Sequence, residues 1–210
     1  MNLNKARRIP LRIFLTLASA ALAAGCTGLQ APKVDDPHLY VLDARPAIKP
    51  AQAKRGLVLA VGMPRAWPGF DTPRMAYLRQ PHELEYFAAN RWADTPSRML
   101  GPLLVQALEQ TESFRAIVQN PGVVPADLRL DTELIRLQQD FGTQPSRVRL
   151  TLRAQLIDMV GKRVIAVKLF DEAENASSDD AYGGVVAANR LVQRMSGELA
   201  AFCVNASAGQ

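Results

Sequence analysis

The chain has 210 residues, a formal net charge of +5 and a pI near 9.5. Its first 25 residues hold four basic side chains and no acidic one, so the rest of the chain carries 21 Lys and Arg against 20 Asp and Glu. A domain with so balanced a charge lacks the basic surface that nucleic-acid binding needs, and we expect no nucleic-acid partner. Apolar residues make up 48% of the chain, which argues against global disorder and supports one domain with a sizeable core.

The N-terminus has the three parts of a secretory signal peptide. Basic residues come first, an apolar run at 13–24 follows, and small residues precede Cys26. The run of about 12 residues is shorter than the roughly 20 that span a bilayer. A cysteine directly after Ala-Gly is typical of a lipobox, the lipidation signal of bacterial envelope proteins. We therefore predict that residues 1–25 are removed and that Cys26 becomes the fatty-acylated first residue of the mature chain.

Two alternatives fit the same composition: an ordinary signal peptide cleaved after an alanine, and an uncleaved N-terminal anchor helix. Ala23 also departs from the lipobox pattern, which favours leucine at that place. The position of Cys26 at the end of the apolar run favours lipidation. Residues 26–37 are then predicted to be the lipidated cysteine and a short polar tether. Thr27 follows the cysteine, where an aspartate would favour retention in the inner membrane of enteric-type bacteria, so sorting to the outer membrane is favoured.

Residues 38–205 are predicted to form a single domain, followed by a tail at 206–210. Its first half contains four predicted strands, at residues 38–43, 57–61, 75–79 and 83–91. The run at 57–61 is uninterrupted and lies between two glycines, which predicts a buried central strand. Residues 63–73 hold three prolines and two aromatic rings and are predicted to be a stiff loop.

A first helix is predicted from Asp94-Thr95-Pro96, a capping side chain followed by proline at the first turn, to about residue 112. A short strand at 114–118 follows it. In the next strand the alternation of apolar and polar residues changes phase, which predicts a β-bulge or a strong twist near Leu134.

The second half ends with a hairpin and a helix. Apolar and polar residues alternate over 148–156, which predicts a strand, and a second strand at 164–170 returns after a turn at 158–162. A helix is then predicted from 181 to 204, with capping residues at 178–180. Together these elements predict an α+β fold, a mainly antiparallel sheet with two helices packed on one face.

The chain offers little for catalysis. It has no Gly-x-Ser-x-Gly elbow, no Gly-x-Gly-x-x-Gly turn and no Walker loop. His38 and His82 are far apart without metal-type neighbours, and we expect both on the surface. Cys203 lies on an apolar helix face, which favours a buried free thiol over the alternative of an intermolecular disulfide. We expect no catalytic residue, no cofactor and no metal site.

Several stretches of the mature chain occur in an informative order. They are Tyr40-Val41-Leu42-Asp43, Met75-Ala76-Tyr77-Leu78-Arg79, Glu85-Tyr86, Arg91-Trp92, the helix up to Leu108, the hairpin of residues 148–170 and the alanine-rich last helix. In this order after a lipobox they resemble the ABC-type transport auxiliary lipoprotein family, the paraquat-inducible protein C-like group.

The resemblance implies a non-enzymatic periplasmic subunit of a lipid-transport system. In such systems an inner-membrane ATPase and permease work with a mammalian-cell-entry (MCE) domain protein that spans the periplasm. The lipoprotein is expected at the outer membrane, on the inner leaflet facing the periplasm, where it docks the MCE protein. A protein that caps a symmetric tube is suited to form a ring of its own copies, so a homo-oligomer is compatible with this role, although no residue pattern in the sequence indicates one.

Two other hypotheses belong to different classes. In the first, the chain is a lipoprotein that itself carries a lipid or another hydrophobic ligand, and this hypothesis predicts an internal apolar cavity. In the second, the chain is an envelope enzyme, and this hypothesis requires a polar cluster in a cleft. For the docking hypothesis, Trp67 and Phe70 in the proline-rich loop are the candidate partner contacts. The alternative for these two rings is that both simply cap the core.

Overall fold

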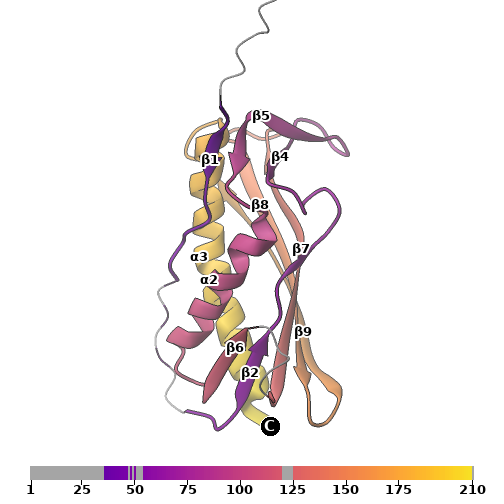
Figure 1. Ribbon diagram of the computed structural model, residues 1–210. Coiled ribbons are helices and arrows are strands. Elements are labelled where there is room, and N and C mark those ends of the chain that lie inside the picture. Colours follow the sequence, from indigo (N-terminus) through magenta and orange to yellow (C-terminus); the bar gives the residue numbers. More distant parts are fainter. Residues whose placement is uncertain (1–35, 47, 49, 51–53, 120–124, 210) are drawn as a thin grey trace, which may run out of the picture. The chain divides into compact units, whose positions relative to one another are not determined.

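The computed structural model describes residues 36–46, 48, 50, 54–119 and 125–209 (Figure 1). Cys26, the predicted signal peptide and most of the predicted tether lie outside these residues, so lipidation stays a prediction. None of the helices in the described part of the chain is long and apolar enough to cross a bilayer.

Nine strands of the described residues form one sheet. They are β1 (His38–Tyr40), β2 (Val58–Val61), β3 (Arg65–Ala66), β4 (Arg74–Leu78), β5 (Leu84–Trp92), β6 (Ala116–Gln119), β7 (Leu128–Asp140), β8 (Arg147–Asp158) and β9 (Arg163–Asn175). The long strand β7 organises this sheet. Along one edge it pairs in turn with the short strands β2, β3 and β4, and along the other it pairs with β8, which pairs with β9.

The prediction of a mainly antiparallel sheet is wrong, because the sheet is mixed. Strands β2, β3 and β4 all run parallel to β7, and the outer pairs β2–β6 and β1–β5 are parallel as well. Only β4–β5, β7–β8 and β8–β9 are antiparallel among the described strands. A turn in the sequence reveals an antiparallel hairpin, but no local signal gives the direction in which strands distant in the sequence meet.

The predicted β-bulge in β7 is confirmed. Leu134 lies opposite Leu152 and Arg136 lies opposite Thr151, so that Ile135 is the extra residue. The predicted buried strand is also confirmed, since all four residues of β2 are buried between β6 and β7. The predicted stiff loop at 63–73 contains one short strand, β3, before it leaves the sheet.

Helices α2 (Pro96–Gln110) and α3 (Ala181–Ala206) pack against each other and share one core with the sheet (Figure 1). The cap of α3 is as predicted, because the Asp180 carboxylate accepts a hydrogen bond from the Gly183 amide at 2.7 Å. In α2 the proline is at the predicted place, but the Thr95 side chain makes no capping hydrogen bond. A short turn, η2 (Ser207–Gly209), follows α3.

Two glycines in the first turn of α3 allow close approaches, one to the turn before the helix and one to the sheet. A side chain at Gly184 would collide with the amide of Gln139 on β7, and one at Gly183 would collide with the Ser178 backbone. The Gln139 amide in turn donates hydrogen bonds to the Ser146 hydroxyl at 2.9 Å and to the Asp180 carbonyl at 3.1 Å. These contacts fix the N-terminus of α3 against β7.

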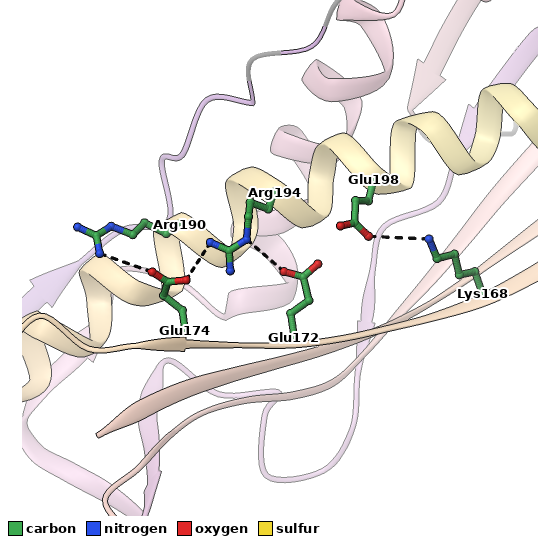
Figure 2. Close-up of polar contacts among 6 residues, drawn as sticks. All are labelled: Lys168, Glu172, Glu174, Arg190, Arg194 and Glu198. Atoms are coloured by element: carbon green, nitrogen blue, oxygen red, sulfur yellow. Dashed lines mark hydrogen bonds and ion pairs between the residues drawn. The ribbon is translucent and has the colours of Figure 1, made fainter. Parts of the chain in front are cut away.

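Further along, α3 is joined to the edge strand β9 by ion pairs, which we call the α3–β9 ladder (Figure 2). Arg194 lies 2.9 Å from Glu174 and 3.3 Å from Glu172, Arg190 lies 3.6 Å from Glu174, and Lys168 lies 3.8 Å from Glu198. The ladder lets charged residues of β9 occupy the helix-covered side of the sheet, because each has a partner on α3.

Candidate partner-docking groove

The proline-rich loop leaves the sheet where a gap in the strands paired with β7 coincides with the bulge in β7. Strands β3 and β4 follow each other along β7 but are separated by residues 67–73, and the bulge at Ile135 faces this gap in pairing. The Trp67 amide donates a hydrogen bond to the Leu134 carbonyl at 2.9 Å, and this bond fixes the start of the loop beside the bulge.

The loop is held by two further hydrogen bonds. The Phe70 amide donates to the Trp67 carbonyl at 2.9 Å, which closes a turn. At Gly69 the backbone has φ = 91°, a conformation that favours glycine, and its carbonyl accepts a hydrogen bond from the Tyr86 hydroxyl at 2.9 Å. The loop is therefore an anchored element of the surface.

The two predicted contact residues lie together but differ in exposure. Phe70 is half-buried and packs against the core, whereas the Trp67 side chain is 48% exposed. Both line one surface hollow of about 770 Å³, which we call the Trp67 groove. Its lining consists of Trp67, Phe70, Leu78, Arg79, Gln80, Pro81, His82, Leu84, Ile135, Arg136, Gln138, Asp140, Gly142, Thr143 and Arg149.

The charges around the Trp67 groove differ in how they are satisfied. Arg149 donates to both oxygens of Asp171, at 2.9 and 2.5 Å, and the Thr151 hydroxyl donates to the same carboxylate at 2.8 Å. The hydrogen bonds from Arg149 lower the pKa of Asp171 to about 2. Arg79 lies 3.8 Å from Glu85.

Arg136 is the exception. It is half-buried and lines the groove, yet it has neither a hydrogen bond nor an ion pair among the described residues, and its charge attracts Asp171 from beyond ion-pair distance. Sequence reasoning singled out the bulge beside Arg136 but missed the arginine itself. No local pattern indicated that the loop at 67–73 would lie against this part of β7, because the two segments are far apart in the sequence.

The predicted surface and core residues are found as expected. His38 and His82 are exposed, and His82 lies at the rim of the Trp67 groove. Cys203 is fully buried, and this burial raises the pKa of its thiol to about 12. The thiol is therefore protonated and shielded at neutral pH. In the part of the chain that the structure describes, no cluster of three or more His, Cys, Asp or Glu could hold a metal ion.

The interior under the sheet also has a small hollow. Between Met75, Trp92, Leu137 and Ala188 it measures about 10 Å³, room for a single water molecule beside the buried, unpaired Gln139 Oε1. An acyl chain does not fit this hollow, so it does not favour the carrier hypothesis.

Comparison with known proteins gives both a family and a fold. The family described as the ABC-type transport auxiliary lipoprotein component matches residues 40–200. No curated protein matches the chain. The crystal structure of protein XCC0632 from Xanthomonas campestris, assigned to DUF330, is similar with a TM-score of 0.73 and 24% identity over 80% of this chain and 95% of that one.

Two further solved structures share the fold. An uncharacterized protein has a TM-score of 0.64 at 14% identity, covering 80% of this chain and 99% of its own. The hypothetical protein CT253 from Chlamydia trachomatis has a TM-score of 0.54 at 10% identity, covering 74% of this chain and all of its own, 100%. At these identities the likeness concerns the fold alone.

Proposed function

Because the chain belongs to the family of ABC-type transport auxiliary lipoprotein components, we propose that it is the non-enzymatic periplasmic lipoprotein of an MCE-type lipid transporter. In this proposal Cys26 carries the lipid that holds the domain at the inner leaflet of the outer membrane. The domain docks the MCE-domain protein that spans the periplasm, and it thereby supports lipid homeostasis of the envelope. The family match over residues 40–200 is the observation that carries the proposal.

The N-terminal sequence supports the membrane part of the proposal. Acyl chains contribute about 0.8 kcal/mol per buried CH₂, so two or more chains on Cys26 form a stable anchor. Residues 26–37 span at most about 40 Å when extended, which keeps the domain near the bilayer. A tethered domain meets its partner at a high effective concentration, and a modest interface is then sufficient.

The Trp67 groove supports the docking part. Trp67 exposes a large aromatic surface on an anchored loop, in the same groove as Arg136, which has no hydrogen bond or ion pair among the described residues. Tryptophan and arginine are the residue types most enriched at the energetic centres of protein interfaces. A partner that covers this groove would bury the indole ring and satisfy the guanidinium together.

The central experiment removes the lipidation site in cells. A Cys26→Ser variant is expected to lose its fractionation with the outer membrane, and chemical crosslinking should no longer recover the MCE-domain protein. The matched control is Cys203→Ser, which removes a thiol but leaves the predicted lipid site unchanged. If Cys26→Ser and Cys203→Ser fractionate identically with the membrane, the lipid anchor is contradicted. If crosslinking of the wild-type protein in cells recovers no MCE-domain protein, the docking role is contradicted.

The same proposal includes two further statements, that the protein is not an enzyme and that it forms a homo-oligomer. Each is tested by a separate measurement. Turnover of a lipid ester by the purified protein would contradict the non-enzymatic role. Native mass spectrometry of the full lipoprotein is expected to show a ring of several copies, and a strict monomer at envelope concentrations would contradict the ring.

A further inference from the structure

The carboxylates near Arg136 form their hydrogen bonds with other groups, although the charge of Arg136 attracts Asp171. Arg136 lies opposite Thr151 across the β7–β8 ladder, and Thr151 lies opposite Asp171 across the β8–β9 ladder. Asp171 receives three hydrogen bonds, two from Arg149 and one from Thr151. Asp171 does not itself line the groove; the carboxylate that does, Asp140, accepts a hydrogen bond from the Gly142 amide at 2.8 Å. A half-buried guanidinium is therefore left with donors that no described side chain uses.

An apolar surface lies directly beside this guanidinium. Trp67 is hydrogen-bonded through its amide to Leu134, two residues before Arg136, and Ile135 lines the same groove. Leu84, 37% exposed, lines the groove from β5. The groove thus offers an apolar contact and an available cation side by side, a combination that selects a ligand with an apolar group next to an anionic one.

We propose that the Trp67 groove binds an extended segment of the partner protein in which a carboxylate side chain lies next to an apolar side chain. The carboxylate pairs with Arg136, and the apolar side chain packs on Trp67, Ile135 and Leu84. This inference rests on the proposed docking function and names the chemistry of the partner at that site.

A protein segment fits the groove better than a lipid tail. Ligand sites for small molecules bury most of the ligand, but here Trp67 itself is 48% exposed, so an acyl chain in the groove would keep one side in water. A protein partner is large enough to cover the solvent-exposed side of the Trp67 ring as well. Gln80 and Thr143 also line the groove; their donors are used by Glu83 and the Pro145 carbonyl, and their oxygens suit the N–H groups of a peptide backbone.

The test uses the mature, acylated lipoprotein in nanodiscs and fluorescent peptides tiled across the periplasmic part of the MCE-domain protein from the same organism. Binding is measured by fluorescence anisotropy. We expect binding of tiles that carry Asp or Glu beside apolar residues, and an Arg136→Glu variant should weaken it at least tenfold. Trp67→Ala should weaken it by a similar factor.

Two controls match these variants. Arg115→Glu reverses an exposed charge near β6, and Tyr182→Ala removes a 62% exposed ring at the start of α3; neither residue lines the groove, and neither change should alter binding. The decisive measurement is a charge swap: a tile with its acid replaced by Lys should bind poorly to the wild type and regain affinity for Arg136→Glu. Thermal unfolding of each variant verifies that the fold is kept.

The outcomes separate this inference from the proposed function. If crosslinking in cells recovers the MCE protein but no tile binds, or the tiles bind wild type and Arg136→Glu equally, the groove assignment is wrong and the docking role stands. If the purified protein instead carries a lipid that is lost in Trp67→Ala, the occupant is a lipid and the inference is overturned. If no MCE protein is recovered from cells, both proposals fail.

Discussion

The α3–β9 ladder and the Trp67 groove lie on opposite faces of the same β-sheet and treat charge in opposite ways. In the ladder every one of the six side chains has an oppositely charged partner on the facing element (Figure 2). In the groove Arg136 has no hydrogen bond and no ion pair among the described residues, although its charge attracts Asp171 from beyond ion-pair distance, and an exposed tryptophan lines the same groove. The fold of this chain alone supplies every partner in the ladder, whereas in the groove it leaves the Arg136 donors to solvent or, as we propose, to a partner.

The largest effect is expected on the helix-covered side. Leu191 is fully buried on α3, so Leu191→Ala removes apolar contacts and leaves a cavity under the sheet. We expect the free energy of unfolding to fall by about 2–5 kcal/mol, measured by denaturant titration. The matched truncation on the other face is Trp67→Ala, and an equal loss there would show that the loop is part of the core and would erase the contrast.

An intermediate effect is expected where the groove borders a satisfied ion pair. The pKa of Asp171 is lowered in the folded state to about 2. Its ion pair with Arg149 therefore stabilises the fold at every pH above the ordinary pKa of an aspartate. This stabilisation is lost as the pH falls from that ordinary pKa toward about 2. Asp171→Asn should therefore be less stable than wild type at pH 7 and nearly equal to it near pH 2. A difference that stays constant over acid unfolding curves from pH 7 to pH 2 would contradict this assignment.

Within the ladder, Glu174→Gln should have a smaller effect. It weakens the pairs with Arg190 and Arg194, and because these side chains are partly exposed we expect a loss of about 0.5–1 kcal/mol that shrinks at high salt. Glu109→Gln, which removes an exposed charge on α2 that has no ion pair among the described residues, is the control. Equal effects of the two changes would mean that the ladder contributes nothing specific.

The smallest effect on stability is expected at Arg136. Because its guanidinium has no hydrogen bond or ion pair among the described residues and attracts Asp171 only from beyond ion-pair distance, Arg136→Gln should change the free energy of unfolding by no more than about 0.5 kcal/mol. The same denaturant titration measures it. A loss as large as that of Glu174→Gln would show that Arg136 is structural, and the comparison between the two faces would then fail.

Much of the fold was predictable because its elements are encoded locally. The buried run of β2, the bulge near Leu134 and the caps around Asp180 each depend on residues that are neighbours in the sequence, and the structure confirms them. The direction of β2, β3 and β4 beside β7 was not predictable. These strands meet through contacts that are distant along the chain, and periodicity reports which face of a strand is buried but not what lies at its edge.

The same division holds for the candidate site. The sequence alone identified the family, from the order of several stretches along the chain after a lipobox. It also gave the prediction of lipidation at Cys26 and singled out the two aromatic rings of the proline-rich loop, because each of these is a pattern of residue types at short spacing. Only the tertiary structure brought Trp67 to the bulge of β7, left Arg136 without a hydrogen bond or ion pair among the described residues and gave Arg194 its two carboxylates. Whether a charge is satisfied depends on neighbours that the chain supplies from far away, and that is decided only when the chain folds.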